Sequence, residues 1–513
     1  MKILSSEQIR IVDTETIRRE GISSLELMRS AATAFCNWFT KAHSNKLSSI
    51  VIFSGTGNNG GDGLVIARIL HKLGYNIEVF IVEYNDSYSD DCAHNIRRIK
   101  AEKISYKKIQ NKKDIPSLEK FDIVIDGIFG IGLSREVSGI AAEAIKEINK
   151  FSLVISGNSE FTSSKINKSV ISIDVPSGLF LDRKTDFAVR AKETITFHTP
   201  KIAFYLPDNY IFVGNVTVVD IGLNEQAISE IESDLYYTEK KSIKTLLKPL
   251  VKFAHKGTEG HALVIGGSLG KIGSMCLASK AALKTGCGLI TAYVPKCGLQ
   301  VIQSQFAEAM VIEDKGNDYI EDIVFNIDPD SIGLGMGMGQ HEDTISAFHQ
   351  FLQCYKVPMV IDADGINILS KRKDWLSLLS PKTILTPHPK ELMRLIGEWS
   401  DDFEKIKKTV ELAQKYDLII VVKGAHSLII DAKCVFVNSS GTPALATAGS
   451  GDVLTGMITS LLAQGYKPID AAKVGVFIHG MTTDLTSHCI HPRSFIASDI
   501  IDNISNCYIN LDS

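Results

Sequence analysis

The residues best suited to chemistry lie in a glycine-rich stretch, Asn438 to Gly456, which contains Gly449-Ser450-Gly451-Asp452. A strand-like segment precedes the glycines and apolar residues at helical spacing follow them, which predicts a strand-to-helix turn. Glycine amides at a helix N-terminus bind anions such as phosphate. Asp452 could take a proton from a hydroxyl group while these amides stabilise negative charge on the phosphate. The alternative is that Asp452 only caps the helix and the glycines form a tight loop.

In the first half of the chain, three segments read as buried parallel strands, and polar or glycine-rich residues follow each of them. The polar segments are Asn58 to Gly63, Asp126 to Glu136 and Asp174 to Gly178. The carboxyl ends of parallel strands share one edge of a sheet, so Asn59, Asp126, Asp174 and Ser177 are expected to meet there. Amide and carboxylate oxygens in such turns suit a hard cation or a polar substrate.

The first polar segment also fits the spacing of a dinucleotide-binding turn, with Gly55, Gly57 and Gly60. Against a plain pyrophosphate turn stand two asparagines and Asp62, because that turn needs close backbone approach and no carboxamide or carboxylate. Asparagine in a left-handed turn is the alternative for either asparagine. A helix is expected from Leu64 to Leu73 after this turn.

Composition and charge limit the class of protein. A chain of 513 residues exceeds what one core usually serves, so two domains are expected. Its 55 Lys+Arg and 59 Asp+Glu give a net charge of −4 without a long block of like charge, which argues against a nucleic-acid partner. The nine cysteines are scattered, so neither a disulfide framework nor a zinc ribbon is indicated. The early polar residues and the lack of a long apolar run predict a cytoplasmic protein without a membrane partner.

The alternation of strand and helix restarts at His255 and predicts a second parallel sheet, with glycine, acid or histidine at the strand ends. Residues 223–244 are polar and acidic and are expected to link the two domains, with a short helix as the alternative. His388 lies between two prolines on a stiff loop and is either structural or part of a site. Lys423 directly follows the strand expected at 418–422. Residues 428–430 are expected to pair with that strand as the edge of a hairpin.

Residues 1–222 resemble the NAD(P)H-hydrate epimerase family through the three polar segments and Phe197-His198-Thr199-Pro200-Lys201. The resemblance implies a Rossmann-like three-layer α/β domain, a potassium site at Asn59, Asp126 and Ser177, and Asp174 as an acid or base. It also implies substrate contacts at Asn58, Asn59, Gly60, Gly61, Asp62, Gly130, Ile131, Gly132, Leu133, Ser134, Arg135, Glu136 and Asp174. The polar stretch 156–168 departs from the family pattern and is expected to be a surface loop.

The Gly-Ser-Gly-Asp turn resembles the Gly-x-Gly-Asp loop of ribokinase-like kinases, and residues 245–513 resemble ADP-dependent NAD(P)H-hydrate dehydratases. The resemblance implies a ribokinase-like fold, Asp452 in the catalytic role, and Mg²⁺ bound with ADP. It places ADP at Lys423, Gly424, Ala425, His426, Ser427 and Gly451. It places the hydrated nicotinamide nucleotide at Ser274, Gly337, Gly339, His388 and Asp452. Lys390 stands where the family has glycine, which leaves the choice between ADP and ATP open.

Together the resemblances imply metabolite repair of hydrated NADH and NADPH by a homo-oligomer. The first domain would interconvert the R and S epimers, and the second would dehydrate the S epimer at the expense of ADP, giving NAD(P)H, AMP and phosphate. Two alternatives stay open. One is a ribokinase-like small-molecule kinase joined to a Rossmann-like nucleotide-binding domain, and the other is a nucleotide-sensing scaffold without activity.

Overall fold

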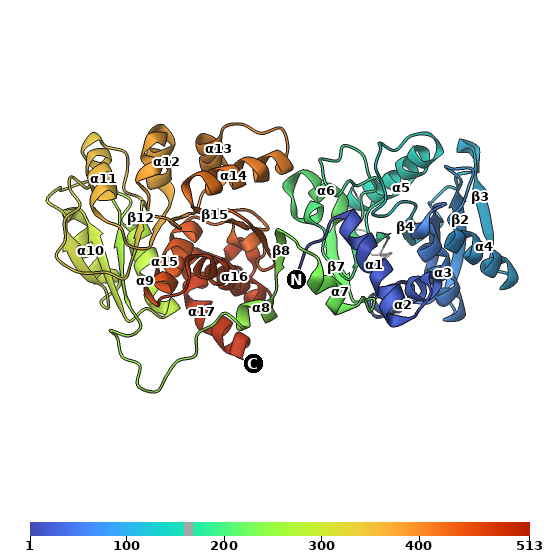
Figure 1. Cartoon of the computed structure of the whole chain (residues 1–513), viewed down its shortest axis with the longest axis horizontal. Coiled ribbons are helices and arrows are strands. Elements are labelled where there is room, and N and C mark those ends of the chain that lie inside the picture. Colours follow the sequence, from blue (N-terminus) through green and yellow to red (C-terminus); the bar gives the residue numbers. More distant parts are fainter. Residues whose placement is uncertain (158–167, 513) are drawn as a thin grey trace. The chain divides into compact units, whose positions relative to one another are not determined.

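The computed structural model describes residues 1–157 and 168–512, which divide into two compact units (Figure 1). The first unit holds Lys2–Ser233 with Asp401–Phe403, and the second holds Met1, Asp234–Ser400 and Glu404–Ser513. Each unit has its own sheet and its own buried apolar clusters. Each therefore has the features of an independent domain.

The first unit is built on a parallel sheet that has seven strands in the described chain, in the order β3-β2-β1-β4-β5-β6-β7. The strands are β1 (Ser49–Ser54), β2 (Asn76–Val82), β3 (Tyr106–Ile109), β4 (Ile123–Gly127), β5 (Ser169–Ile173), β6 (Glu193–Phe197) and β7 (Asn215–Val219). Successive residues of a strand point to opposite faces. Ile50 and Ile52 of β1 therefore enter one apolar cluster, while Val51 and Phe53 enter another.

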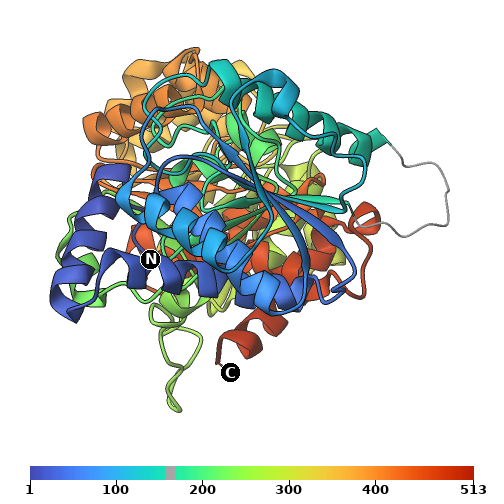
Figure 2. The same cartoon turned by 90° about the vertical axis from the view of Figure 1, so that its right-hand side faces the viewer.

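Helices cover both faces of this sheet, as Figure 2 shows from the side of this unit. The main helices are α1 (Ser6–Glu20), α2 (Ser24–Ala42), α3 (Asn58–Lys72), α4 (Asp90–Ala101), α5 (Gly139–Gly157) and α7 (Glu225–Glu230). α2, α3 and α4 pack on the face of Ile50 and Ile52, and α5 packs on the other face. The arrangement is a three-layer Rossmann-like fold, and its strand order confirms the expected class.

The second unit is built on a larger mixed sheet, which has ten strands in the described chain, in the order β11-β10-β9-β12-β13-β14-β15-β16-β17-β8. The strands are β8 (Leu235–Thr238), β9 (His261–Ile265), β10 (Leu289–Val294), β11 (Met310–Glu313), β12 (Ser331–Leu334), β13 (Met359–Ile361), β14 (Ile384–Leu385), β15 (Ile419–Val422), β16 (Leu428–Ile430) and β17 (Val435–Asn438). β9 to β15 pair in parallel, and β15, β16 and β17 pair in antiparallel fashion.

Helices also cover this sheet (Figure 1). They include α8 (Lys240–Lys244), α9 (Gly273–Thr285), α10 (Lys296–Gln305), α11 (Glu342–Cys354), α12 (Ala363–Lys371), α13 (Pro389–Ile396), α14 (Asp402–Tyr416), α15 (Ser450–Ala463), α16 (Pro468–Thr486) and α17 (Ala497–Asp512). None of the helices in the described chain combines the length and hydropathy needed to cross a membrane.

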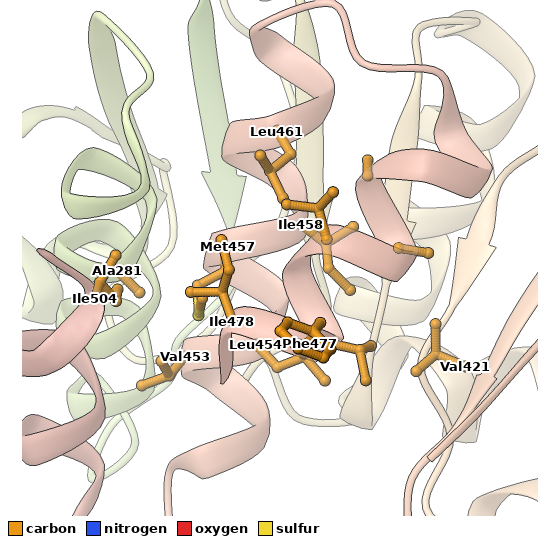
Figure 3. Close-up of a cluster of buried hydrophobic side chains, with 14 of the residues drawn as sticks. Ala281, Val421, Val453, Leu454, Met457, Ile458, Leu461, Phe477, Ile478 and Ile504 are labelled. Carbon is orange, nitrogen blue, oxygen red and sulfur yellow. The ribbon is translucent and has the colours of Figure 1, made fainter. Parts of the chain in front are cut away.

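Helix α15 lies inside the core of the second unit. Apart from Gly451 and Asp452, every residue of this helix is buried. Figure 3 shows its side chains gathered with those of α16 in one cluster, among them Leu454, Ile458 and Phe477. This packing fixes the helix, and so it also fixes the position of Asp452.

Three elements differ from expectation. Residues 223–244 contain the boundary between the two units, after Ser233; they form the short helices α7 and α8, which the alternative allowed, and also β8, which was not expected and pairs with β17. α3 begins at Asn58 rather than Leu64, so the polar segment forms its first turns. The strand β16 is not at an edge, because β17 and β8 extend the sheet beyond it. The polar stretch 156–168 falls largely on residues 158–167, which lie outside the described chain.

Candidate active sites in the two units

A cavity of about 950 Å³ lies at the carboxyl edge of the sheet in the first unit. Its walls come from the residues that follow β1, β2, β4, β5 and β6, and from α1 and α2. Of the residues expected at the substrate, Asn58, Asn59, Asp62, Gly130 to Glu136 and Asp174 line it. Gly60 and Gly61 are buried instead, and a Cβ on Gly60 would lie 2.0 Å from the Gly55 carbonyl oxygen. These two glycines therefore permit close packing under the cavity.

The three residues expected at potassium come together around the backbone of Phe129. Asp126 is fully buried, and its carboxylate accepts hydrogen bonds from Ser177 Oγ (2.5 Å) and Ser177 N (2.8 Å). Phe129 N donates to Ser177 Oγ (2.8 Å), and Asn59 Nδ2 donates to the Phe129 carbonyl oxygen (2.7 Å). Burial raises the pKa of Asp126, while hydrogen bonds from Ser177 oppose the rise. One carboxylate among neutral oxygens matches the donor set of a hard cation.

Asp174 forms a buried ion pair with Lys201, a residue to which sequence reasoning gave no separate role. Lys201 Nζ lies 2.7 Å from Asp174 Oδ1 and also donates to Thr196 Oγ1 (2.6 Å) and to the Phe197 carbonyl oxygen (3.2 Å). Lys201 is only 1% exposed. Thr196 Oγ1 and Phe197 N also donate to Asp174 Oδ1, so this oxygen is fixed by three donors. The signal for Lys201 was present in the Phe-His-Thr-Pro-Lys motif.

α1 adds groups to this cavity to which sequence reasoning gave no role. Arg10 and Asp13 lie one turn apart on α1, and both line the cavity. Burial raises the pKa of Asp13 to about 6, with a further rise from Asp174 and an opposing effect from Lys201. Burial also raises the pKa of Asp62 well above its usual range, and the nearby carboxyls of Asp174 and Asp13 add to this. The cavity thus holds carboxyl groups suited to proton transfer near neutral pH.

The glycine turn of the second unit has the geometry expected of an anion site. Gly449 adopts φ +85°, a conformation that favours glycine, and α15 begins at the next residue. Asp452 is the third residue of α15, in the first turn, where the backbone amides have no acceptor within the helix and no side chain caps them. Burial raises the pKa of Asp452 to about 6; Asp362 adds to the rise, and Ser274 and Lys423 oppose it. A carboxyl with this pKa is poised to act as a base near neutral pH.

Lys423 reaches the same turn from the end of β15. Its ammonium lies 2.8 Å from Asp362 Oδ1, and a Cβ on Gly451 would lie 3.2 Å from Lys423 Nζ. Thr455 Oγ1, one turn after Asp452 on α15, donates to Asp362 Oδ2 (2.9 Å). Sequence reasoning placed Asp362 at a strand end but gave it no function. In the sequence, the position of its carboxylate at the end of a strand was the only indication that Asp362 belongs to a site.

Of the residues expected at the nicotinamide nucleotide, Ser274 forms a hydrogen bond with Asp452, and Gly337 lies beside Ser274. A Cβ on Gly337 would lie 3.4 Å from Ser274 Oγ, and Gly339 N donates to Asp364 Oδ2 (2.9 Å). His388 is the N-cap of α13, and its Nδ1 accepts from the amides of Lys390 (3.1 Å) and Glu391 (3.4 Å). Burial and the Lys423 charge lower the pKa of His388.

Residues 424–427, expected at ADP, form the turn between β15 and β16. Gly424 and Ser427 are linked by a hydrogen bond from Gly424 N to Ser427 Oγ (3.4 Å). His426 Nδ1 lies 3.2 Å from the Asn438 carbonyl oxygen. Ala425 follows Gly424 on the exposed part of the turn. The turn therefore follows Lys423 directly, and Gly424 and Ala425 are exposed.

His479 is a further buried residue beside the glycine turn that sequence reasoning missed. Its Nε2 lies 3.1 Å from Ser450 Oγ and 3.0 Å from the Ser450 carbonyl oxygen. Burial lowers the pKa of His479 to about 4, so it is neutral and holds the start of α15 by hydrogen bonding. No sequence signal marked it, because a histidine within an apolar helix is usually structural.

The folds and sites define a two-domain α/β protein, in which a Rossmann-like domain is joined to a ribokinase-like domain with an acid beside a glycine turn. Residues 262–506 match the family model described as NAD(P)H-hydrate dehydratase, and residues 24–203 match that described as YjeF-related protein N-terminus. The chain belongs to the family of bifunctional NAD(P)H-hydrate repair enzymes, since it is 31% identical to such a relative over nearly the whole of both chains.

That relative is the bifunctional NAD(P)H-hydrate repair enzyme Nnr of Dictyoglomus turgidum, and the match covers 98% of this chain and 97% of the relative. The enzyme of the same name from Moorella thermoacetica is 29% identical, and the match covers 100% of this chain and 97% of that enzyme. Among solved structures, the ADP/ATP-dependent NAD(P)H-hydrate dehydratase from Bacillus subtilis, co-crystallised with ATP/Mg²⁺, is 26% identical. The match covers 54% of this chain and 98% of the Bacillus subtilis chain, with a TM-score of 0.47.

Proposed function

We propose that the chain repairs hydrated NADH and NADPH through two activities on one polypeptide. Residues 1–222 carry the epimerase, which interconverts the R and S forms, and residues 245–513 carry the dehydratase, which acts on the S form at the expense of ADP. The observation that carries the proposal is the match to relatives with this name over almost their whole length. Both sites described above supply the groups that such reactions need.

In the dehydratase we assign Asp452 the role of base. It accepts the proton of the C6 hydroxyl, whose oxygen then attacks the terminal phosphorus of ADP, while the bond from that phosphorus to the bridging oxygen breaks and AMP leaves. The amides at the start of α15, with Lys423, stabilise the negative charge that develops on the phosphate. Once phosphorylated, the hydroxyl leaves as inorganic phosphate, and loss of a proton from the neighbouring C5 restores the dihydropyridine ring. Phosphorylation is needed because hydroxide is a poor leaving group.

The ADP site would be formed by Gly451 with Lys423 and the turn residues Gly424, Ala425, His426 and Ser427. Mg²⁺ would enter as the metal complex of ADP and reduce the charge on its phosphates. The S-epimer would lie against Ser274, Gly337, Gly339 and His388. Support for this placement comes from the position of Ser274 beside both Gly337 and Asp452.

In the epimerase, the cavity of the first unit would hold the substrate against Asn58, Asp62, Asp174 and the loop 130–136. Potassium would be held by Asn59, Asp126, Ser177 and the Phe129 carbonyl oxygen, where it would neutralise one buried carboxylate and order the loops. Asp174 is the candidate acid or base. Because three donors bind its Oδ1, we assign proton transfer to Oδ2.

The same proposal places the protein in the cytoplasm as a homo-oligomer whose other partners are small molecules. All nine cysteines lie in the described chain as free thiols, which supports a reducing compartment. Size-exclusion chromatography with light scattering would measure the oligomeric state.

The test is turnover of a mixed-epimer preparation of hydrated NADH by the full chain, with ADP or ATP and Mg²⁺. The proposal expects equal amounts of NADH and inorganic phosphate, and complete conversion of both epimers when potassium is present. A stable phosphorylated product would overturn the dehydratase and support the kinase. Conversion of only the S epimer would overturn the epimerase assignment.

A further inference from the structure

Asp362 occupies the N-cap position of α12, yet its carboxylate does not cap that helix. Aspartate at this position normally accepts a hydrogen bond from the amides of the first helical turn. Here Oδ1 accepts from Lys423 Nζ (2.8 Å) and Oδ2 accepts from Thr455 Oγ1 (2.9 Å). The Asp362 side chain is almost fully buried; its contact with Thr455 is sheltered from water, and its contact with Lys423 is partly buried. The helix thus loses a cap, and the carboxylate serves the neighbouring glycine turn instead.

The two contacts join the elements that build the phosphoryl site. Lys423 follows β15, Thr455 lies on α15 one turn after Asp452, and Asp362 follows β13. A Cβ on Gly451 would lie 3.6 Å from Asp362 Oδ2, so the carboxylate sits directly against the glycine turn. The backbone of Asp362 is itself fixed, since its N donates to the Leu334 carbonyl oxygen and its O accepts from Gly365 N. Asp362 is therefore a rigid support for Lys423.

We propose that Asp362 is a positioning residue of the dehydratase: it holds the Lys423 ammonium where the ADP phosphates bind, and its negative charge keeps Asp452 an effective base. The inference rests on the proposed dehydratase function and adds the residue that orients its cation. Lys423 has a long flexible side chain, and without a fixed partner it would sample many positions. An anchored ammonium lowers the entropy cost of binding phosphate.

The second role follows from the charges around Asp452. The charged groups that act on Asp452 are Asp362 and Lys423, and the Ser274 hydroxyl is its hydrogen-bonded neighbour. His388 and Glu391 lie near Lys423 and Asp362, and His479, which is neutral, lies near Lys423. After burial, Asp362 is the main cause that raises the pKa of Asp452, while Lys423 lowers it. Removing the Asp362 charge takes away the rise and leaves the Lys423 charge uncompensated. Both changes move the pKa of Asp452 downward.

The test uses Asp362→Asn in the full chain, because the amide keeps the shape of the side chain and removes only its charge. We expect the KM for ADP to rise by about 10-fold or more, in line with the loss of a charged hydrogen bond that orders the ligand site. We also expect the acid limb of the dehydratase pH profile to move to lower pH. Thr455→Val is the matched control, since it removes the other contact of Asp362 without changing charge and should leave the acid limb in place.

A double-variant cycle tests whether Asp362 acts through Lys423. In a Lys423→Met background, Asp362→Asn should raise the KM for ADP by less than about threefold, because the group to be positioned is already absent. The double variant also removes both charges of the buried pair, so it covers the case in which the single variant does not fold.

The outcomes separate the inference from the function on which it rests. If wild-type protein forms NADH and phosphate while Asp362→Asn leaves both the KM for ADP and the acid limb unchanged, the inference is wrong and the dehydratase stands. If raised Mg²⁺ alone restores the variant fully, Asp362 is a metal ligand and the inference is also wrong. If wild-type protein releases no phosphate with NADH, the proposed dehydratase itself fails.

Discussion

The buried pair of Lys201 and Asp174 gives the sharpest prediction for the first unit. Lys201→Met keeps the length of the side chain and removes its ammonium, which leaves the Asp174 carboxylate buried with one donor fewer. The Thr196 hydroxyl and the Phe197 carbonyl oxygen lose the same partner. Breaking a buried ion pair by removing one member typically costs about 3–5 kcal/mol. We expect a loss of that order in the free energy of unfolding of this unit.

The assay is hydrogen exchange read by mass spectrometry on the full chain, because two units do not unfold as one two-state system. Protection should fall in peptides that cover β5 and β6, while peptides of the second unit act as an internal reference. Adding Asp174→Asn should recover part of the loss, since the variant pair no longer buries an unpaired charge. A change below about 1 kcal/mol in Lys201→Met would refute the reasoning, because it would mean that water or another group compensates the carboxylate.

The remaining predictions concern the two sites. Gly451→Ala places a methyl group 3.2 Å from Lys423 Nζ, so ADP affinity measured by calorimetry should fall by about 10-fold; an unchanged Kd would remove Gly451 from the ADP site. The pKa of Asp452 near 6 predicts that dehydratase kcat/KM falls as the pH drops below about 6, and a flat profile from pH 5 to 8 would contradict its role as base. Because the folded protein raises this pKa, the charged form costs stability once the pH rises through it. Asp452→Asn should therefore stabilise the second unit at neutral pH by up to about 3 kcal/mol in thermal unfolding, and destabilisation would contradict the pKa shift. Replacing potassium by lithium, or Ser177 by alanine, should slow epimerisation and leave dehydration of the purified S epimer unchanged; equal activity in both salts would exclude potassium.

The sequence was most informative where a strand end, a glycine and a polar side chain fall close together in the chain. The turn at Gly449 to Asp452 and the segments at Asn59, Asp126 and Ser177 were predicted for that reason, and the structure places each set at the carboxyl edge of its sheet. Parallel strands deliver their ends to one edge, so this part of the site follows from the topology alone.

The groups that the sequence did not reveal reach the sites through tertiary packing. Asp362 and Thr455 are 93 residues apart, and only the order of β13, β15 and α15 in the fold brings them together. Asp13 lies on α1, far in sequence from the polar segments, and it reaches the cavity only through the packing of that helix. The segment 223–244 was predicted to be a linker because it is polar and acidic, and that composition did not reveal β8 or the full burial of Ile243. The local sequence pattern carries little information on which faces of a helix or strand are buried by the rest of the domain.

The most direct test of the central claim is phosphorus NMR of the full chain turning over the S epimer of hydrated NADH with ADP and Mg²⁺. Wild-type protein should release inorganic phosphate and AMP in step with NADH, while Asp452→Asn should bind ADP normally and release none. A stable phosphorylated nucleotide in the wild-type reaction, or phosphate release by the variant at the wild-type rate, would contradict the account.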